Sequence, residues 1–186
     1  MKKLIAFYGS PRIGGNSSIL LSRFLDGVRE SKKYQISEIF LREYNISPCL
    51  EIYKCKETGR CIINDDFQKI YDQIEAADTV AIASPVMFYA VSAHTKILMD
   101  RCQSFWARRY ILKREMSQKD GYFFCVGATR GQKLFDGILM SVKYFFDTFN
   151  CKLKESILVR GVDEKGEILN YPEYLKMAYE LGKKID

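Results

Sequence analysis

The sequence predicts a doubly wound α/β domain, with a mostly parallel sheet between two layers of helices. Five apolar runs of strand length alternate along the chain with five segments that carry apolar residues at helical spacing. This is the order of a parallel sheet with helical crossovers. The chain has 186 residues, 47% of them hydrophobic, and only four prolines, which suits one core without internal linkers. We therefore expect a single domain over residues 1–186.

The first half of the chain predicts two strands and two helices. Residues 3–8 (KLIAFY) form a short apolar run typical of a buried strand, and residues 17–30 have helical spacing, with Asn16 or Ser17 as the N-cap. Residues 34–41 (YQISEIFL) alternate apolar and polar side chains, as a half-buried strand does. Residues 66–76 fit a short helix, and Asp65-Asp66 suits its capping position better than a pair of reactive carboxylates.

The second half continues the alternation. Residues 79–83 are a continuous apolar run that predicts a buried strand, and the segment SPVMFYAVS leads from it into a helix that ends near Trp106. Residues 121–126 (GYFFCV) predict another strand, and residues 134–149 an aromatic-rich helix. The series closes with a strand and an amphipathic helix, at residues 155–160 and 171–185.

Composition argues against several other classes of protein. The N-terminal apolar run is too short for a signal peptide and has no cleavage site. The longest apolar stretch, residues 79–91, falls short of the roughly 20 residues of a membrane span. The net charge of +6 is spread along the chain, which hardly favours nucleic acid. We expect a cytoplasmic protein with reduced thiols and with no membrane or nucleic-acid partner.

The loop after the first strand, GSPRIGGNSS, predicts a phosphate site. Ligands of doubly wound sheets bind at the carboxyl ends of the strands, and a helix N-terminus with hydroxyl groups suits a phosphate. A plain capped turn is the alternative. The loop has neither G-x-G-x-x-G nor G-K-[ST], which disfavours a dinucleotide fold and a P-loop. The candidate phosphate ligands are Ser10, Arg12, Asn16, Ser17 and Ser18.

Two further strands end in loops that suit a planar ring. SPVMFYAVS, residues 84–92, places a proline and bulky side chains directly after a strand, which fits a heteroaromatic ring but equally fits core packing. GATRG, residues 127–131, has small residues that permit close backbone approach. Together the three loops describe a site for a mononucleotide with a ring.

GSPRIGGNSS, SPVMFYAVSAHTKILMDR and VGATRG resemble the NADPH-dependent FMN reductases of the flavodoxin-like superfold, in the branch that includes the iron–sulfur flavoproteins. The likeness covers most of the chain. It implies a three-layer sandwich with a five-stranded parallel sheet in order 2-1-3-4-5, FMN bound non-covalently, and homodimers or homotetramers with the flavin near an interface. It also implies ring and ribityl contacts, with Met87 standing where the family frequently has an aromatic residue. These contacts are Pro85, Val86, Met87, Phe88 and Tyr89, with Gly127, Ala128 and Thr129 on the other side.

The predicted function is that of an FMN-dependent NAD(P)H oxidoreductase, of the flavin reductase or quinone reductase type. NADPH or NADH would be the co-substrate, a small molecule the acceptor, and no side chain is expected to be catalytic because the flavin carries the hydride. A flavodoxin-type electron carrier with a partner reductase is the alternative, although such carriers are typically acidic. A non-enzymatic nucleotide-binding module is a third possibility. Aromatic-rich stretches at Phe105-Trp106 and residues 144–149 fit an oligomer contact.

Three cysteines, Cys49, Cys55 and Cys61, have the spacing C-x5-C-x5-C. The resemblance to the iron–sulfur flavoproteins implies the cysteine spacing C-x2-C-x2-C, with a fourth cysteine further on. When Cys49, Cys55 and Cys61 are aligned with that spacing, Ile52 stands at the second ligand position. A four-iron cluster ordinarily takes four cysteines, so we expect no metal here, with a cluster on the three cysteines as the alternative. The spacing also disfavours zinc. The other cysteines fit small core residues, namely Cys102, Cys125 and Cys151.

Overall fold

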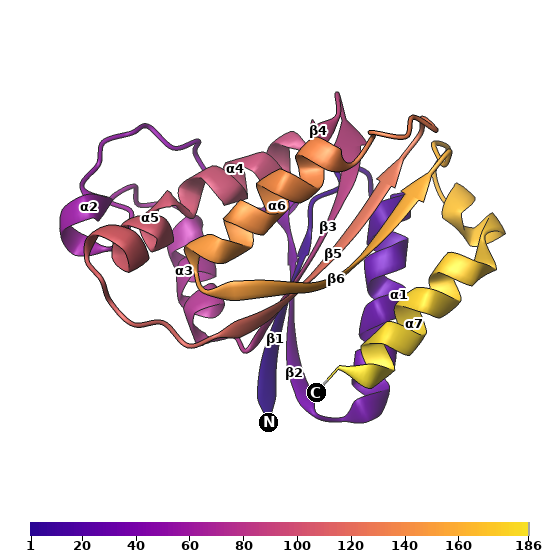
Figure 1. The fold of residues 1–186 in the computed structure, drawn as a ribbon, viewed down its shortest axis with the longest axis horizontal. Helices are drawn as coiled ribbons and strands as arrows, with labels where there is room; N and C mark the ends of the chain where they lie inside the picture. Colours follow the sequence, from indigo (N-terminus) through magenta and orange to yellow (C-terminus); the bar gives the residue numbers. More distant parts are fainter. Residues whose placement is uncertain (186) are drawn as a thin grey trace.

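The computed structural model describes residues 1–185 and has a three-layer α/β fold (Figure 1). Five parallel strands form the sheet in the order β2-β1-β3-β5-β6, which is 2-1-3-4-5 when the parallel strands are counted along the chain. The predicted fold class is therefore confirmed. The parallel strands are β1 (Lys2–Tyr8), β2 (Tyr34–Phe40), β3 (Thr79–Met87), β5 (Lys119–Gly127) and β6 (Cys151–Arg160).

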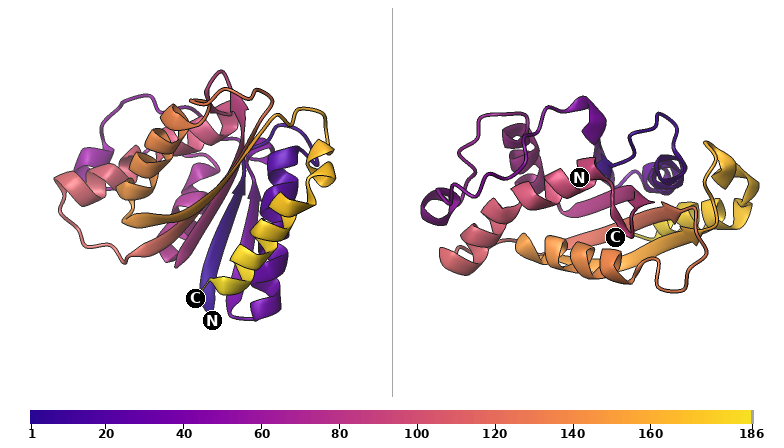
Figure 2. Two further views of the ribbon diagram at one scale, coloured as in Figure 1. Left: turned by 45° about the vertical axis from the view of Figure 1, so that its right-hand side comes forward. Right: turned by 90° about the horizontal axis from the view of Figure 1, so that it is seen from above.

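Helices cover both faces of the sheet (Figures 1 and 2). On one face α1 (Asn16–Ser31) packs beside α7 (Pro172–Lys184). On the other face lie α3 (Phe67–Ala76), α4 (Ala93–Arg101) and α6 (Asp136–Thr148). Side chains of successive strand residues point to opposite faces, and this divides the apolar interior into two cores. In β1, Leu4, Ala6 and Tyr8 belong to the α1 side and Ile5 and Phe7 to the α3 side.

Short elements complete the chain. They are the 3-10 helices η1 (Leu41–Glu43) and η3 (Glu167–Asn170), the one-turn helices α2 (Cys55–Thr58) and α5 (Gln103–Trp106), and the π-helix η2 (Ala107–Ile111). The Tyr71 hydroxyl donates to the carbonyl of Gly59, and Arg114 donates to the carbonyl of Thr58. These two bonds hold α2 against α3 and against the segment that follows η2.

Two features differ from the sequence prediction near the carboxyl edge. The strand predicted to end at Ala83 continues to Met87 and pairs antiparallel with a sixth, unpredicted strand, β4 (Ala90–Val91). Proline is usually excluded from central strands, because it cannot donate a hydrogen bond to a neighbouring strand. Here β1 pairs with β3 only as far as Ala83, so Pro85 lies where one edge of β3 has no neighbour.

The prediction of one continuous helix as far as Trp106 is also wrong in one respect. It is interrupted at Cys102, which separates α4 from α5. No proline or glycine marks this position, so the sequence carries no local signal for the interruption.

No helix within residues 1–185 is long and apolar enough to cross a membrane.

Candidate functional site

The N-terminus of α1 carries two buried hydroxyl groups without a hydrogen-bond partner. Ser17 and Ser18 are almost fully buried, and neither Oγ atom bonds another protein group. The N-cap is Gly15 rather than the predicted Asn16 or Ser17, and no side chain caps the helix. The N–H groups of the first turn have no partner within the helix. This helix end therefore presents donors and a partial positive charge without an acceptor.

Arg12 and Asn16 connect this helix end to the loop before η3. Arg12 Nη1 donates to the Asp163 carbonyl at 2.9 Å. Asn16 Nδ2 donates to the Glu164 carbonyl at 2.9 Å and the Asp163 carbonyl at 3.4 Å, while its Oδ1 accepts from the Ile168 backbone at 3.2 Å. The Asn16 amide is thus occupied by the protein itself, and only its backbone is left for a ligand.

The loops after β1, β3 and β5 meet at a cavity of about 150 Å³, as the strand order requires. Predicted site residues that line it are Ser10, Arg12, Asn16, Ser17, Pro85, Val86, Met87 and Ala128. Predicted residues outside its lining are Ser18, Phe88, Tyr89, Gly127 and Thr129. The sequence analysis missed Val162 and Asp163, which follow β6 and also line the cavity. The signal that could have found them is that β6 also ends at this carboxyl edge, so the loop after it can reach the same cavity.

A network of buried hydroxyls fixes the first two loops to each other. Ser92 Oγ donates to the Gly9 carbonyl at 2.6 Å, and the Ser92 N–H donates to Ser84 Oγ at 2.9 Å. Ser92 is the N-cap of α4 and accepts from the Thr95 N–H. A Cβ at Gly9 would lie 1.9 Å from Thr95 Oγ1, so only glycine fits there. The sequence analysis missed this network, although a serine directly before a helix is a preferred N-cap residue.

Phe88 and Tyr89 form the two-residue turn between β3 and β4. Both have positive φ, +49° and +59°, as a type I′ hairpin requires. A bulky residue with a positive φ carries backbone strain of order 1–3 kcal/mol. Phe88 is fully exposed, whereas the Tyr89 hydroxyl lies against the third loop, 3.1 Å from where a Cβ on Gly131 would stand. The turn therefore holds a large apolar side chain in solvent beside the cavity.

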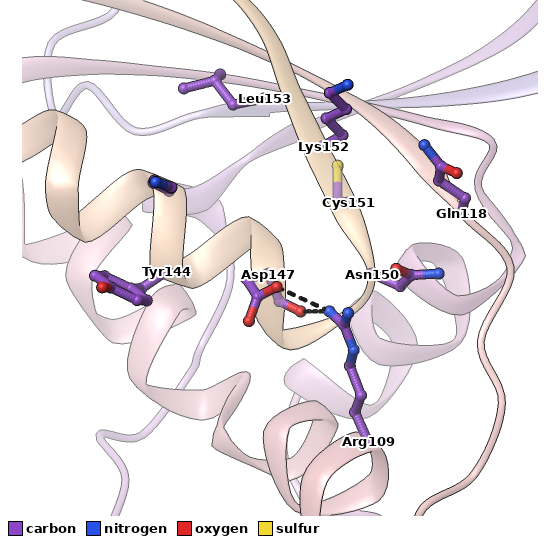
Figure 3. A pocket seen from close by; sticks show the side chains of 9 residues that line it. Arg109, Gln118, Tyr144, Asp147, Asn150, Cys151, Lys152 and Leu153 are labelled. Carbon is purple, nitrogen blue, oxygen red and sulfur yellow. Dashed lines mark hydrogen bonds and ion pairs between the residues drawn. The ribbon is translucent and has the colours of Figure 1, made fainter.

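A wider depression of about 730 Å³ lies at the opposite end of the sheet (Figure 3). It is bounded by η2, the end of α6 and the start of β6. Arg109 is already occupied, because its Nη1 donates to the Asp147 carboxylate at 3.1 Å and to the Asp147 carbonyl. Lys143 and Lys152 are exposed. These groups do not converge on a buried point, so the helix end of α1 remains the better ligand site.

The six cysteines separate into two groups. Cys102, Cys125 and Cys151 are buried, as predicted, and burial raises the pKa of each thiol. The loop cysteines are partly buried and free, namely Cys49, Cys55 and Cys61. Over residues 1–185, no group of three or more His, Cys, Asp or Glu side chains gathers as a metal site.

A sheet in this strand order, with an unsatisfied phosphate-type helix end at its carboxyl edge, defines the class of flavodoxin-like mononucleotide-binding proteins. Residues 2–145 match the family of NADPH-dependent FMN reductases. An iron–sulfur flavoprotein of Methanocaldococcus jannaschii is 35% identical over 198 residues, covering 98% of this chain and 95% of that protein. The chain belongs to this family, in the branch of the iron–sulfur flavoproteins, and is a flavin-dependent oxidoreductase.

Solved structures share the fold. The NAD(P)H:quinone oxidoreductase from Methanothermobacter marburgensis has a TM-score of 0.77 at 16% identity, over 97% of this chain and 94% of that one. An azoreductase from Bacillus anthracis has a TM-score of 0.73 at 14% identity over the full length of both chains. At these identities the likeness establishes the flavodoxin-like fold and nothing finer.

Proposed function

We propose that this protein is an FMN-dependent NAD(P)H oxidoreductase of the flavin reductase or quinone reductase type, with a small-molecule acceptor. The observation that carries the proposal is the pair of unpartnered hydroxyls at Ser17 and Ser18. A buried hydroxyl without a partner costs free energy, and a phosphate at this helix end would accept hydrogen bonds from both. FMN has such a phosphate, and the description of the family supports the same cofactor.

The chain's own residues would bind and orient the cofactor. Ser10, Ser17, Ser18 and the first N–H groups of α1 would hold the phosphate, with Arg12 adding charge. Pro85, Val86 and Met87 line the cavity beside them and would exclude water from one edge of the ring. Bound FMN would supply two-electron chemistry, taking hydride from NADPH or NADH and passing electrons to the acceptor.

Replacing Ser17 and Ser18 together by alanine tests the phosphate site. Each lost hydrogen bond to a charged group should cost about 1.5–3 kcal/mol, which weakens FMN binding by about 10- to 150-fold per bond. The free energy of unfolding of the FMN-free protein should stay unchanged or rise, because these hydroxyls lose no protein partner. Fluorescence titration with FMN and urea unfolding measure the two effects.

Ser10→Ala is the matched comparison for stability. Ser10 is also a proposed phosphate ligand, but its Oγ already accepts from the Arg12 N–H at 3.1 Å, so this substitution, unlike the double variant, should destabilise the FMN-free protein. Asn16→Ala is a poor test, because it also removes two hydrogen bonds to the loop before η3 and one from Ile168 within η3. Undiminished FMN affinity in the Ser17/Ser18 double variant would remove the assignment of the phosphate site.

Reduction by a pyridine nucleotide separates the enzyme from an electron carrier. A net charge of +6 is unlike the acidic surface of such carriers, which favours the enzyme. NADPH or NADH should therefore bleach the bound flavin under anaerobic conditions, without any partner protein. If the flavin stays oxidised with both nucleotides, yet is reduced by dithionite, the protein is an electron carrier and not an NAD(P)H oxidoreductase.

The name of the relatives raises a third candidate, a cluster on Cys49, Cys55 and Cys61. The donor set does not fit a four-iron cluster, because three thiols stand where four are ordinarily needed. Ile52, at the second ligand position, is 55% exposed and cannot coordinate iron. We propose that the loop holds no cluster. Stoichiometric iron and acid-labile sulfide in anaerobically purified protein would reverse this proposal.

A further inference from the structure

The loop after β5, residues 128–133, is held by a side chain from the end of β6. Arg160 Nε donates to the carbonyl of Gly131 at 3.1 Å, and Arg160 Nη2 donates to that of Gln132 at 3.0 Å. The guanidinium also lies over the ring of Phe135, 4.7 Å from the ring centre. Residues 128–133 are all exposed, so burial contributes little to the conformation of this loop.

The contact between the loops after β5 and β6 is reciprocal. Gly161, the residue after Arg160, has a φ of +72°. A Cβ at Gly161 would stand 2.7 Å from Arg130 Cζ, so the glycine leaves the space that the Arg130 guanidinium fills. The Val162 N–H donates to the Gly127 carbonyl at 3.2 Å. Each loop therefore contributes one arginine to the contact, and a backbone hydrogen bond joins them as well.

These two loops form part of the wall of the cavity at the carboxyl end of the sheet, where the strand arrows end in Figure 1. Ala128 lines the cavity from the loop after β5, and Val162 and Asp163 line it from the loop after β6. The loop after β5 also meets the turn between β3 and β4, because the Tyr89 hydroxyl lies 3.1 Å from the position of a Cβ on Gly131. The arginine contacts thus set the position of one side of the cavity.

Holding this loop before a ligand arrives should strengthen binding. A loop that is mobile in the free protein must be ordered when the ligand binds, and the lost conformational entropy weakens the binding. A planar guanidinium that bonds two successive carbonyls fixes the direction of both. The family resemblance assigns Gly127, Ala128 and Thr129 to the ring and ribityl part of FMN, so the benefit should fall on that part and not on the phosphate.

We propose that Arg160 is a positioning residue for the flavin ring, which holds the loop after β5 in the conformation that contacts the ring. This inference rests on the proposed function, since it requires FMN in the cavity. The phosphate is assigned to Ser17, Ser18 and the N-terminus of α1 instead. The contribution of Arg160 and that of the phosphate site are therefore separable by experiment.

Amide hydrogen exchange of the FMN-free protein tests whether Arg160 holds the loop. Leu134 and Val162 report on it, because their N–H groups donate to the carbonyls of Gly131 and Gly127. Both amides should exchange about 10-fold faster in Arg160→Ala, because the loop then opens more often. Amides in the centres of β5 and β6 should keep their exchange rates. Unchanged exchange at both reporting amides would overturn the proposal.

Riboflavin carries the flavin ring without the phosphate, and it therefore separates the two parts of the site. In fluorescence titrations, Arg160→Ala should weaken the binding of riboflavin and of FMN by the same factor, about 10-fold. The Ser17/Ser18 double variant should weaken the binding of FMN alone. Arg160→Lys keeps the charge but lacks the planar fork, so it should behave as Arg160→Ala does.

Lys154→Ala is the matched control. It removes an exposed positive charge from the same strand and should change neither the exchange of the two amides nor the affinity for either flavin.

Several outcomes would overturn the role of Arg160. They are an unchanged affinity of Arg160→Ala for both flavins, a loss confined to FMN, which would place Arg160 at the phosphate, and full recovery in Arg160→Lys, which would assign the effect to charge. A parent protein that binds neither flavin would remove the proposed function as well. If Arg160→Ala weakens both flavins while the Ser17/Ser18 double variant weakens neither, the role of Arg160 is supported and only the phosphate assignment falls.

Discussion

Asp65 shows how one carboxylate serves both a helix and a distant loop. Its oxygens accept hydrogen bonds from the backbone of Phe67 and Ser47 and from Arg101. Of the Asp65-Asp66 pair that the sequence assigned to helix capping, Asp66 is the N-cap of α3 but makes no side-chain cap bond, and Asp65 alone accepts from the first turn. The pair with Arg101 is nearly buried, with 8% of the Asp65 side chain exposed and none of the Arg101 side chain.

Replacing Asp65 by asparagine should lower the free energy of unfolding by about 3–5 kcal/mol at neutral pH, because it leaves the Arg101 charge buried without its counter-ion. Burial alone would raise the pKa of Asp65, but hydrogen bonds from Arg101 and Ser47 outweigh it and lower this pKa. A carboxylate with a lowered folded-state pKa stabilises the protein above its unfolded pKa, near 3.9, and loses that effect as the pH falls through the folded value.

The difference in unfolding free energy between the parent and Asp65→Asn should therefore shrink as the pH falls below about 3.9. Urea unfolding at neutral pH and at several acidic values measures it. Asp66→Asn is the control, since Asp66 is the adjacent carboxylate and pairs with Lys69 at the surface. An equal loss in the two variants, or a difference that persists at the lowest pH, would contradict the role assigned to the buried pair.

Residue types alone pointed to part of the candidate site. Ser10, Ser17 and Ser18 were recognisable because small hydroxyl residues before an amphipathic helix are typical of a phosphate loop. The actual partners of Asn16 were not recognisable. They are backbone groups about 150 residues away in the chain, and only the complete fold brings them together.

At the scale of elements, the Phe88-Tyr89 turn is a strained connection beside the cavity. Replacing this pair by Asn-Gly should raise the free energy of unfolding by about 1–3 kcal/mol, because those residues adopt the type I′ turn without steric cost. FMN affinity should fall at the same time, since the family resemblance assigns both aromatic residues to the ring. Thermal unfolding of the FMN-free variant and a flavin titration measure the two changes.

A gain in stability with unchanged FMN affinity would show that the turn does not touch the cofactor. The matched control is Tyr53→Gly. Tyr53 also has positive φ, +62°, but belongs to the loop that carries Cys49, Cys55 and Cys61, so this variant should relieve strain without any effect on flavin binding.

The strands were predictable where the apolar pattern is local. Residues 79–83 and residues 121–126 are each a continuous apolar run, and they lie within β3 and β5 respectively. The ends of the strands were not predictable. Lys119 begins β5 and is buried because its ammonium donates to the carbonyls of Glu75 and Ala77 near the end of α3. From the sequence alone, a lysine at the start of a strand would be assigned to the protein surface.

At the scale of the whole molecule, two observations indicate that the single chain leaves its site incomplete. The cavity holds about 150 Å³, whereas cofactor sites commonly enclose about 300–1,000 Å³. Phe88 stands in solvent at its rim. Part of a bound flavin would therefore lie outside the chain that holds its phosphate, and a second copy of the chain would have room to cover it.

The aromatic stretches that favoured an oligomer from the sequence need a correction. Phe105, Phe145, Phe146 and Phe149 are buried in the core of the single chain, so they are not available to a partner. Tyr144 is the aromatic residue of α6 that stays exposed, one helical turn from the exposed Met140. Tyr144 lines a groove of about 510 Å³ that α6 shares with α4 and α5.

We propose that the protein is a homodimer or homotetramer that uses this face, and we expect light scattering at micromolar concentration to give at least twice the chain mass of 21.6 kDa. Tyr144→Glu should shift the assembly towards single chains, because a charge in an apolar contact must be desolvated. Met177→Glu, at another exposed apolar position, on α7, is the control and should leave the mass unchanged. A parent mass near 21.6 kDa with FMN bound would refute the assembly. The same shift in both variants would move the contact away from α6.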